Sequence, residues 1–187
     1  MIRRILVLAL VAMAGTFSAQ VSADKSADKA AIDEFLKSDV VAEFHKSAYG
    51  YAVFPNVAKG GVGIGAAHGK GGVYRGGKRT GEATMTQLSI GLQLGGQAYR
   101  QVIYFENKDA YTVFTSGNFE FGAQAEAIAI TASAGVQAGT EGASASANTT
   151  QHETKYHKGM IVFTMGKGGL MYQASIGGQS YDFKAAE

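Results

Sequence analysis

Apolar residues between positions 25 and 47 recur at spacings of three and four, which is the period of an amphipathic helix. We expect a break at Ser38-Asp39, because Ser38 is a suitable N-cap for a second short helix, and we expect Gly50 to end that helix. Such helices could cover a sheet or lie on a membrane, and covering a sheet is the commoner arrangement. The apolar positions are Ala31, Ile32, Phe35, Leu36, Val40, Val41 and Phe44.

From Tyr51 onward apolar residues alternate with small or polar ones, which is typical of β-strands. Pro55-Asn56 should end the first strand, and Gly95-Gly96 predicts a hairpin turn. The segments Gly69–Gly72 and Arg75–Lys78 are rich in turn residues. The expected strands are Tyr51–Phe54, Gly61–Ala66, Thr84–Leu94, Gln97–Glu106, Phe119–Ala129, Met160–Met165, Leu170–Ile176 and Ser180–Phe183.

One of these strands, Gly61–Ala66, has a bare face. Val62, Ile64 and Ala66 fall on one side, whereas the other side carries only the hydrogens of glycines. A bare face lets another backbone, a helix or a ligand approach very closely.

A short helix is expected between Asn107 and Gly117, since Asn107 can cap its start and Gly117 can end it. Its apolar face should consist of Ala110, Val113 and Phe114. Residues 139–155 are polar and low in complexity, which predicts a mobile loop. The expected fold class is therefore α+β: a twisted antiparallel, glycine-rich β-sheet or incomplete barrel with N-terminal helices and one short middle helix.

Residues 1–23 are expected to be a signal peptide. After a positively charged start, residues 5–14 are apolar and Val21-Ser22-Ala23 suits a signal peptidase. We expect cleavage after Ala23 and a single domain over residues 24–187. The chain has no cysteine, which excludes a disulfide scaffold and a lipid-modified cysteine. The expected location is the periplasm, without a lipoprotein anchor.

Charge is unevenly distributed along this chain. The net charge is about −2 over residues 24–49, +5 over residues 50–105 and −3 over residues 106–187. Residues 50–105 also contain 14 of the 26 glycines. The basic middle is a local patch on a neutral protein, which argues against a nucleic-acid partner.

Motifs for catalysis and cofactor binding are not complete. Gly72–Lys78 matches the phosphate-loop pattern GxxxxGK, but Arg79 stands where Ser or Thr must hold magnesium. His152 and His157 lie in a polar segment, and a zinc site needs three or four converging ligands. The sequence does not point to an acid, a base and a nucleophile that could act together. We therefore expect that the protein is not an enzyme and that it binds no metal and no cofactor.

The remaining candidate is the basic patch on the glycine-rich turns. Cationic side chains beside exposed backbone N–H groups suit phosphate, so we expect them to bind lipid headgroups. Ordinary solvated charges at turns explain the same composition equally well. The patch consists of Lys59, Lys70, Arg75, Lys78, Arg79 and Arg100.

Several ordered motifs resemble those of the SYLF lipid-binding domain family, over roughly residues 30–183. The opening of the family is similar to Ala48–Val57 followed by Gly60–Gly72, and its central strand pair to Leu88–Gln97. The later matches are Asn107–Gly117, Phe119–Ala123, Met165–Leu170 and Ser175–Gly178. The chain departs from the family at Gly81–Thr84, where a Trp-Ser-x-Pro segment often stands.

The resemblance implies a lipid-binding module. Eukaryotic relatives bind phosphoinositides and fungal ones are linked to actin, but the periplasm contains neither actin nor, normally, phosphoinositides. The sequence therefore predicts an envelope protein that docks on anionic phospholipid or a membrane surface through its basic glycine-rich region. The alternative is a structural or protein-interaction module of the periplasm without lipid specificity.

Overall fold

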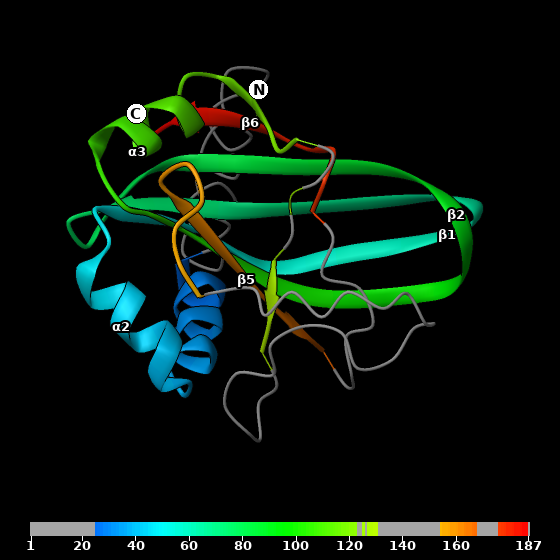
Figure 1. Ribbon diagram of the computed structural model, residues 1–187, viewed down its shortest axis with the longest axis horizontal. Helices are drawn as coiled ribbons and strands as arrows, with labels where there is room; N and C mark the ends of the chain where they lie inside the picture. Colours follow the sequence, from blue (N-terminus) through cyan, green and yellow to red (C-terminus); the bar gives the residue numbers. More distant parts are fainter. Residues whose placement is uncertain (1–24, 123–124, 126, 131–153, 168–175, 187) are drawn as a thin grey trace, which may run out of the picture.

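The computed structural model describes residues 25–122, 125, 127–130, 154–167 and 176–186 (Figure 1). The expected signal peptide, His152, most of the expected loop and most of the expected strand Leu170–Ile176 lie outside the described residues.

Two helices open the described chain. One covers residues 25–35 and the other, α2, covers Asp39–Ser47. The break between them is confirmed, and Ser38 is the N-cap residue of α2, although its side chain makes no capping hydrogen bond. Figure 1 shows both helices on the same side of the sheet, at its left-hand end. Their buried apolar residues are Ala31, Ile32, Phe35 and Val41.

One very long antiparallel ribbon dominates the sheet. It consists of β1 (Gly50–Arg75) and β2 (Lys78–Phe105). The turn between them is Gly76-Gly77, with φ values of 56° and 74°, a region open to glycine at little cost. The predicted hairpin at Gly95-Gly96 is therefore wrong, because these two residues pair with Gly61 and Gly60 inside the ribbon.

Two other expected interruptions are also part of the ribbon. At Pro55 the chain does not leave the sheet; the register shifts between Phe54 and Val57, as in a β-bulge. A bulge removes the need for the backbone N–H that proline lacks. The segment Gly69–Gly72 is strand rather than turn, paired with Glu82–Met85.

The ribbon folds back over itself, so it has three parts (Figure 1). The base arm is residues 50–59 with 97–105. The bend is residues 60–66 with 88–96. The return arm is residues 67–75 with 78–87.

Glycine makes this close packing of the two arms possible. A Cβ on Gly69 would lie 2.9 Å from the Asn56 carbonyl oxygen, and one on Gly71 would overlap the carbonyl oxygen of Val53. The close backbone approach across the arms is therefore found at Gly69 and Gly71, outside the segment Gly61–Ala66 for which it was predicted. The strict alternation of that segment is interrupted by a register shift between Val62 and Ile64.

Among the described residues, shorter strands complete a six-stranded sheet. β5 (Met160–Gly166) pairs with the base arm of β2, and β6 (Gln179–Ala185) pairs with its return arm. β3 (Asn118–Glu120) joins β6. β4 (Ile128–Ala129) pairs with β5 in parallel, so the sheet is mixed rather than purely antiparallel. The expected strand Phe119–Ala129 thus contributes only these two short pieces among the described residues.

The middle helix is confirmed as α3 (Lys108–Phe114). Asn107 caps it, because its side-chain oxygen accepts a hydrogen bond of 3.0 Å from the Ala110 N–H. The predicted apolar face is wrong at Val113, which is 53% exposed. The buried residues are Ala110, Tyr111 and Phe114.

The base arm is buried on both faces over residues 52–54 and 101–105, and the described residues form two cores. One core, containing Phe54, Ile103 and Phe105, lies between the two arms and under α3 and β6. The other, containing Val53 and Tyr104, lies between the sheet and the N-terminal helices. The predicted α+β fold with a curled, incomplete barrel is confirmed.

Candidate anion-binding groove

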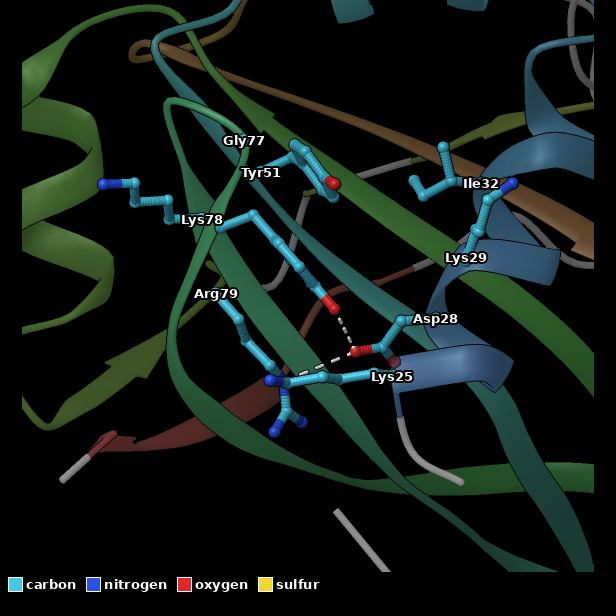
Figure 2. Close-up of a pocket in the computed structure, with 9 residues that line it drawn as sticks. Lys25, Asp28, Lys29, Ile32, Tyr51, Gly77, Lys78 and Arg79 are labelled. Carbon is cyan, nitrogen blue, oxygen red and sulfur yellow. Dashed lines mark hydrogen bonds and ion pairs between the residues drawn. The ribbon is translucent and has the colours of Figure 1, made fainter. Parts of the chain in front are cut away.

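A groove of about 560 Å³ lies between the N-terminal helix and the tip of the ribbon. The helix covering residues 25–35 forms one wall, and the base and return arms form the other (Figure 2). Its lining combines four cationic side chains, one carboxylate, two tyrosines and an isoleucine. The lining residues are Lys25, Asp28, Lys29, Ile32, Tyr51, Tyr74, Gly77, Lys78 and Arg79.

Asp28 is the buried anchor of this groove, with only 3% of its surface exposed. Its Oδ2 accepts a hydrogen bond of 2.6 Å from the Tyr74 hydroxyl and lies 3.5 Å from Nε of Arg79. The side chain fits there because Gly72 opposes it, and a Cβ on Gly72 would overlap the carboxylate. Asp28 therefore joins the N-terminal helix to the ribbon tip.

Arg79 has more hydrogen-bond donors than partners. Only 15% of its side chain is exposed, and a guanidinium carries five N–H donors. Nε makes an ion pair with Asp28 but has no hydrogen-bond acceptor, and Nη2 lies 3.9 Å from a carboxylate oxygen of Glu82. A guanidinium with unmet donors beside a groove is suited to bind an anion in a bidentate manner.

The two tyrosines form an aromatic wall. Tyr51 and Tyr74 stack with ring centroids 4.9 Å apart and planes inclined by 10°. Burial, followed by the hydrogen bond to Asp28, raises the pKa of Tyr74 well above its ordinary range. Burial and the Asp28 charge also raise the pKa of Tyr51. Both hydroxyls therefore stay protonated near neutral pH and add no negative charge to the groove.

The lysines surround the groove at its surface. The Lys29 ammonium lies 2.6 Å from Asp33, one helical turn away, in an exposed ion pair. Lys78 is exposed, and Figure 2 shows its ammonium directed away from Asp28. Exposed lysine side chains change rotamer readily, so these positive charges can reorient toward an incoming anion.

The six basic residues predicted from the sequence do not gather in one place. Lys78 and Arg79 line the groove. Lys70 lies 4.0 Å from Glu82, the acid that also approaches Arg79. Arg75 lies over the ring of Tyr111, 5.5 Å from its centroid. These four belong to the return arm and the tip.

Lys59 and Arg100 belong to the base arm instead. Lys59 is half-buried, and burial lowers its pKa. Arg100 pairs in the ladder with Met165 and lies close enough to Lys167 to contribute, after burial, to the lowered pKa of that lysine.

Sequence reasoning missed the three charged residues of the helix wall, Lys25, Asp28 and Lys29. A signal for them exists, because these residues and Ile32 follow the spacing of three and four that places side chains on one helix face. Nothing local shows that this face meets the ribbon tip.

Comparison with known proteins shows the family of this chain. Residues 86–186, more than half of the chain, match the family model described as "Ysc84: Las17-binding protein actin regulator". The chain belongs to the Ysc84/SYLF family. This SYLF domain is also 31% identical over 166 residues to "Beta cell expansion factor A" of Aeromonas veronii. That alignment includes 87% of this chain but only 56% of the relative's length.

The matched stretch of the SYLF domain begins after the groove, since every groove residue precedes position 86. The groove is therefore a candidate anion-binding site because of the geometry of this chain and not because of the family match. Within the described ranges no group of three His, Cys, Asp or Glu side chains could hold a metal ion. Over the same ranges, no helix is long and apolar enough to cross a membrane.

Proposed function

We propose that this SYLF domain is a lipid-binding protein of the bacterial envelope and that its groove takes the phosphate of an anionic phospholipid headgroup. Membership of the family supports a lipid-binding or interaction module in general terms. The preference for anionic headgroups, the site and the location are our proposals. No catalytic step or cofactor forms part of the proposal.

The observation that carries the proposal is the guanidinium of Arg79. It is largely shielded from water, its Nε has no hydrogen-bond acceptor, and it adjoins a groove with three lysines. Nε is held only by its 3.5 Å ion pair with Asp28 and is therefore not fully satisfied, and a buried donor left without any acceptor costs about 1–3 kcal/mol. A phosphate oxygen entering the groove would give the guanidinium a short, charge-assisted hydrogen bond.

The lysines supply attraction at longer range. Each cationic side chain near an anionic membrane contributes about 1 kcal/mol, and the contribution declines with salt. Of the six residues predicted from the sequence, we propose Lys78 and Arg79 for direct headgroup contact. Lys70 and Arg75 lie on the surrounding surface, whereas Lys59 and Arg100 lie on the base arm and do not line the groove.

The expected signal peptide supports an envelope location, because it would export the domain to the periplasm. There the available anionic surface is that of phospholipid membranes. The alternative, a periplasmic protein-interaction module without lipid specificity, predicts a specific protein partner and no preference among vesicles.

Vesicle flotation tests the proposal. We expect the wild-type protein to float with vesicles containing phosphatidylglycerol, to float poorly with pure phosphatidylcholine, and to be released by salt. Lys25→Gln, Lys29→Gln and Lys78→Gln together should weaken binding about 100-fold, from about 1 kcal/mol per charge.

The matched control removes three exposed lysines elsewhere, with Lys46→Gln, Lys108→Gln and Lys184→Gln. It should bind much more tightly than the groove variant. Equal losses in both variants, or equal wild-type binding to neutral vesicles, would contradict the proposed site. Absence of binding to every vesicle would favour the protein-interaction alternative.

A further inference from the structure

The bend of the ribbon is a bare two-stranded projection among the described residues. β2 pairs with β6 as far as Gln87 and with β5 from Tyr99, and between these positions it pairs only with β1. Figure 1 shows both strands turning back at the right-hand end of the molecule, opposite the helices.

Large aliphatic side chains are exposed on this bend. Ile64 is 66% exposed and Leu88 is 78% exposed. They are diagonal neighbours on one face of the ribbon, because Ile64 pairs with Ile90 and Ala66 pairs with Leu88. Moving such side chains from water to an apolar environment is favourable, so their exposure favours an apolar partner.

Charged residues are excluded from the bend and placed at its borders. Residues 60–69 and 83–99 contain no Asp, Glu, Lys or Arg. Three of the four residues that bound these stretches are basic, namely Lys59, Lys70 and Arg100, and the fourth is Glu82. An uncharged apolar centre with basic borders is complementary to a bilayer, whose acyl chains lie beneath a layer of phosphates.

We propose that the bend enters the interface of an anionic bilayer, with Ile64 and Leu88 among the acyl chains and Lys59, Lys70 and Arg100 near the phosphates. This inference rests on the proposed lipid-binding function and adds a second contact, remote from the groove. Lys59 and Arg100, which do not line the groove, would contribute to membrane binding through this second contact.

Tryptophan fluorescence tests the insertion directly, because the chain has no tryptophan of its own. Ile64→Trp and Leu88→Trp each introduce one probe, and Val113→Trp is the control. Val113 is also exposed, but it lies on α3, at the opposite end of the molecule (Figure 1). With vesicles containing phosphatidylglycerol, emission from positions 64 and 88 should shift to the blue and be quenched by brominated acyl chains. Emission from position 113 should do neither.

A second pair of variants measures the contribution of the bend without a probe. Ile64→Ser with Leu88→Ser should weaken vesicle binding about tenfold, corresponding to partial loss of two apolar contacts. Val113→Ser should leave it unchanged. The salt dependence of binding should persist in all of these variants, because the groove charges are intact.

The outcomes separate this inference from the proposed function. Vesicle binding with tryptophans that stay exposed to water would overturn the insertion and leave the groove proposal standing. Failure to bind any vesicle would overturn both. A blue shift that grows with protein concentration in the absence of lipid would show self-association through the bend and would also overturn the insertion.

Discussion

The ribbon tip and the bend are made by the same two strands, yet they have opposite surfaces. At the tip, Arg79 and Tyr74 meet a carboxylate from the N-terminal helix, and the polar groups are largely shielded. At the bend, Ile64 and Leu88 face solvent and no charged residue is present. The difference arises because a helix covers the tip, whereas no third strand among the described residues pairs with the bend.

The ribbon tip and the bend are too far apart to contact the same lipid headgroup. Leu88 lies ten positions after Lys78 along β2, which is about 33 Å of extended strand. We therefore expect independent contributions, with headgroup chemistry decided at the tip and apolar insertion decided at the bend.

The largest expected effect is on stability, and it should differ between a glycine substitution in the return arm and one in the bend. Gly71→Ala should lower the free energy of unfolding by about 3 kcal/mol, because its Cβ would overlap the Val53 backbone of the base arm. Gly96→Ala, in the bend, should be nearly neutral, since the nearest atom to its Cβ is 3.9 Å away. Urea unfolding measures the free energy of unfolding of both variants. Similar stabilities would show that the arms are not in the close contact described.

A smaller effect should be confined to the tip. Arg79→Lys keeps the charge but loses the planar, bidentate donor geometry, so binding of soluble short-chain phosphatidylglycerol should weaken about tenfold. When Ile64→Trp is added to Arg79→Lys, the tryptophan at position 64 should still insert into the bilayer. Calorimetric titration gives the first result and brominated-lipid quenching gives the second. A variant that binds as well as the wild type would mean that charge alone matters at this position.

The smallest effect concerns the helices that cover the tip. His45 of α2 lies 3.3 Å from the Tyr104 hydroxyl and contacts Tyr51 of the groove, and burial lowers its pKa. The unfolded chain then binds a proton more readily than the folded one. The contribution of neutral His45 to the free energy of unfolding is fully present above the unfolded pKa of about 6.5. That contribution is lost as pH falls through the folded pKa.

His45→Gln should flatten that part of the pH dependence. Urea unfolding at pH 7.5 and pH 5.5 compares the two proteins, and Gly96→Ala in the bend is a control that retains His45. An unchanged pH dependence in His45→Gln would exclude this histidine as the cause.

Local signals in the sequence predicted the elements that local interactions determine. The break at Ser38 and the cap at Asn107 both depend on residues within one helical turn, and both are confirmed. The hairpin was misplaced because Gly76-Gly77 and Gly95-Gly96 have the same local chemistry. Only the packing of the return arm on the base arm distinguishes them.

The groove was only half predictable for the same reason. Lys78 and Arg79 were recognised from their charge beside glycine, but Asp28 lies 46 residues before its partner Tyr74. Their contact exists because the ribbon folds back and brings its tip to the N-terminal helix. The exposed side chains of the bend could not be recognised either, since alternation alone does not say which face is covered.

The most direct test of the central claim observes the Arg79 guanidinium during headgroup binding. Residues 24–187 contain three arginines, so Arg75 and Arg100 are internal controls. In a ¹H–¹⁵N spectrum, the Nε–H signal of Arg79, assigned by its loss in Arg79→Lys, should shift most on titration with short-chain phosphatidylglycerol. Short-chain phosphatidylcholine should leave it in place. An Arg79 signal that stays unmoved while the protein binds phosphatidylglycerol, or that shifts equally with both lipids, would contradict the account.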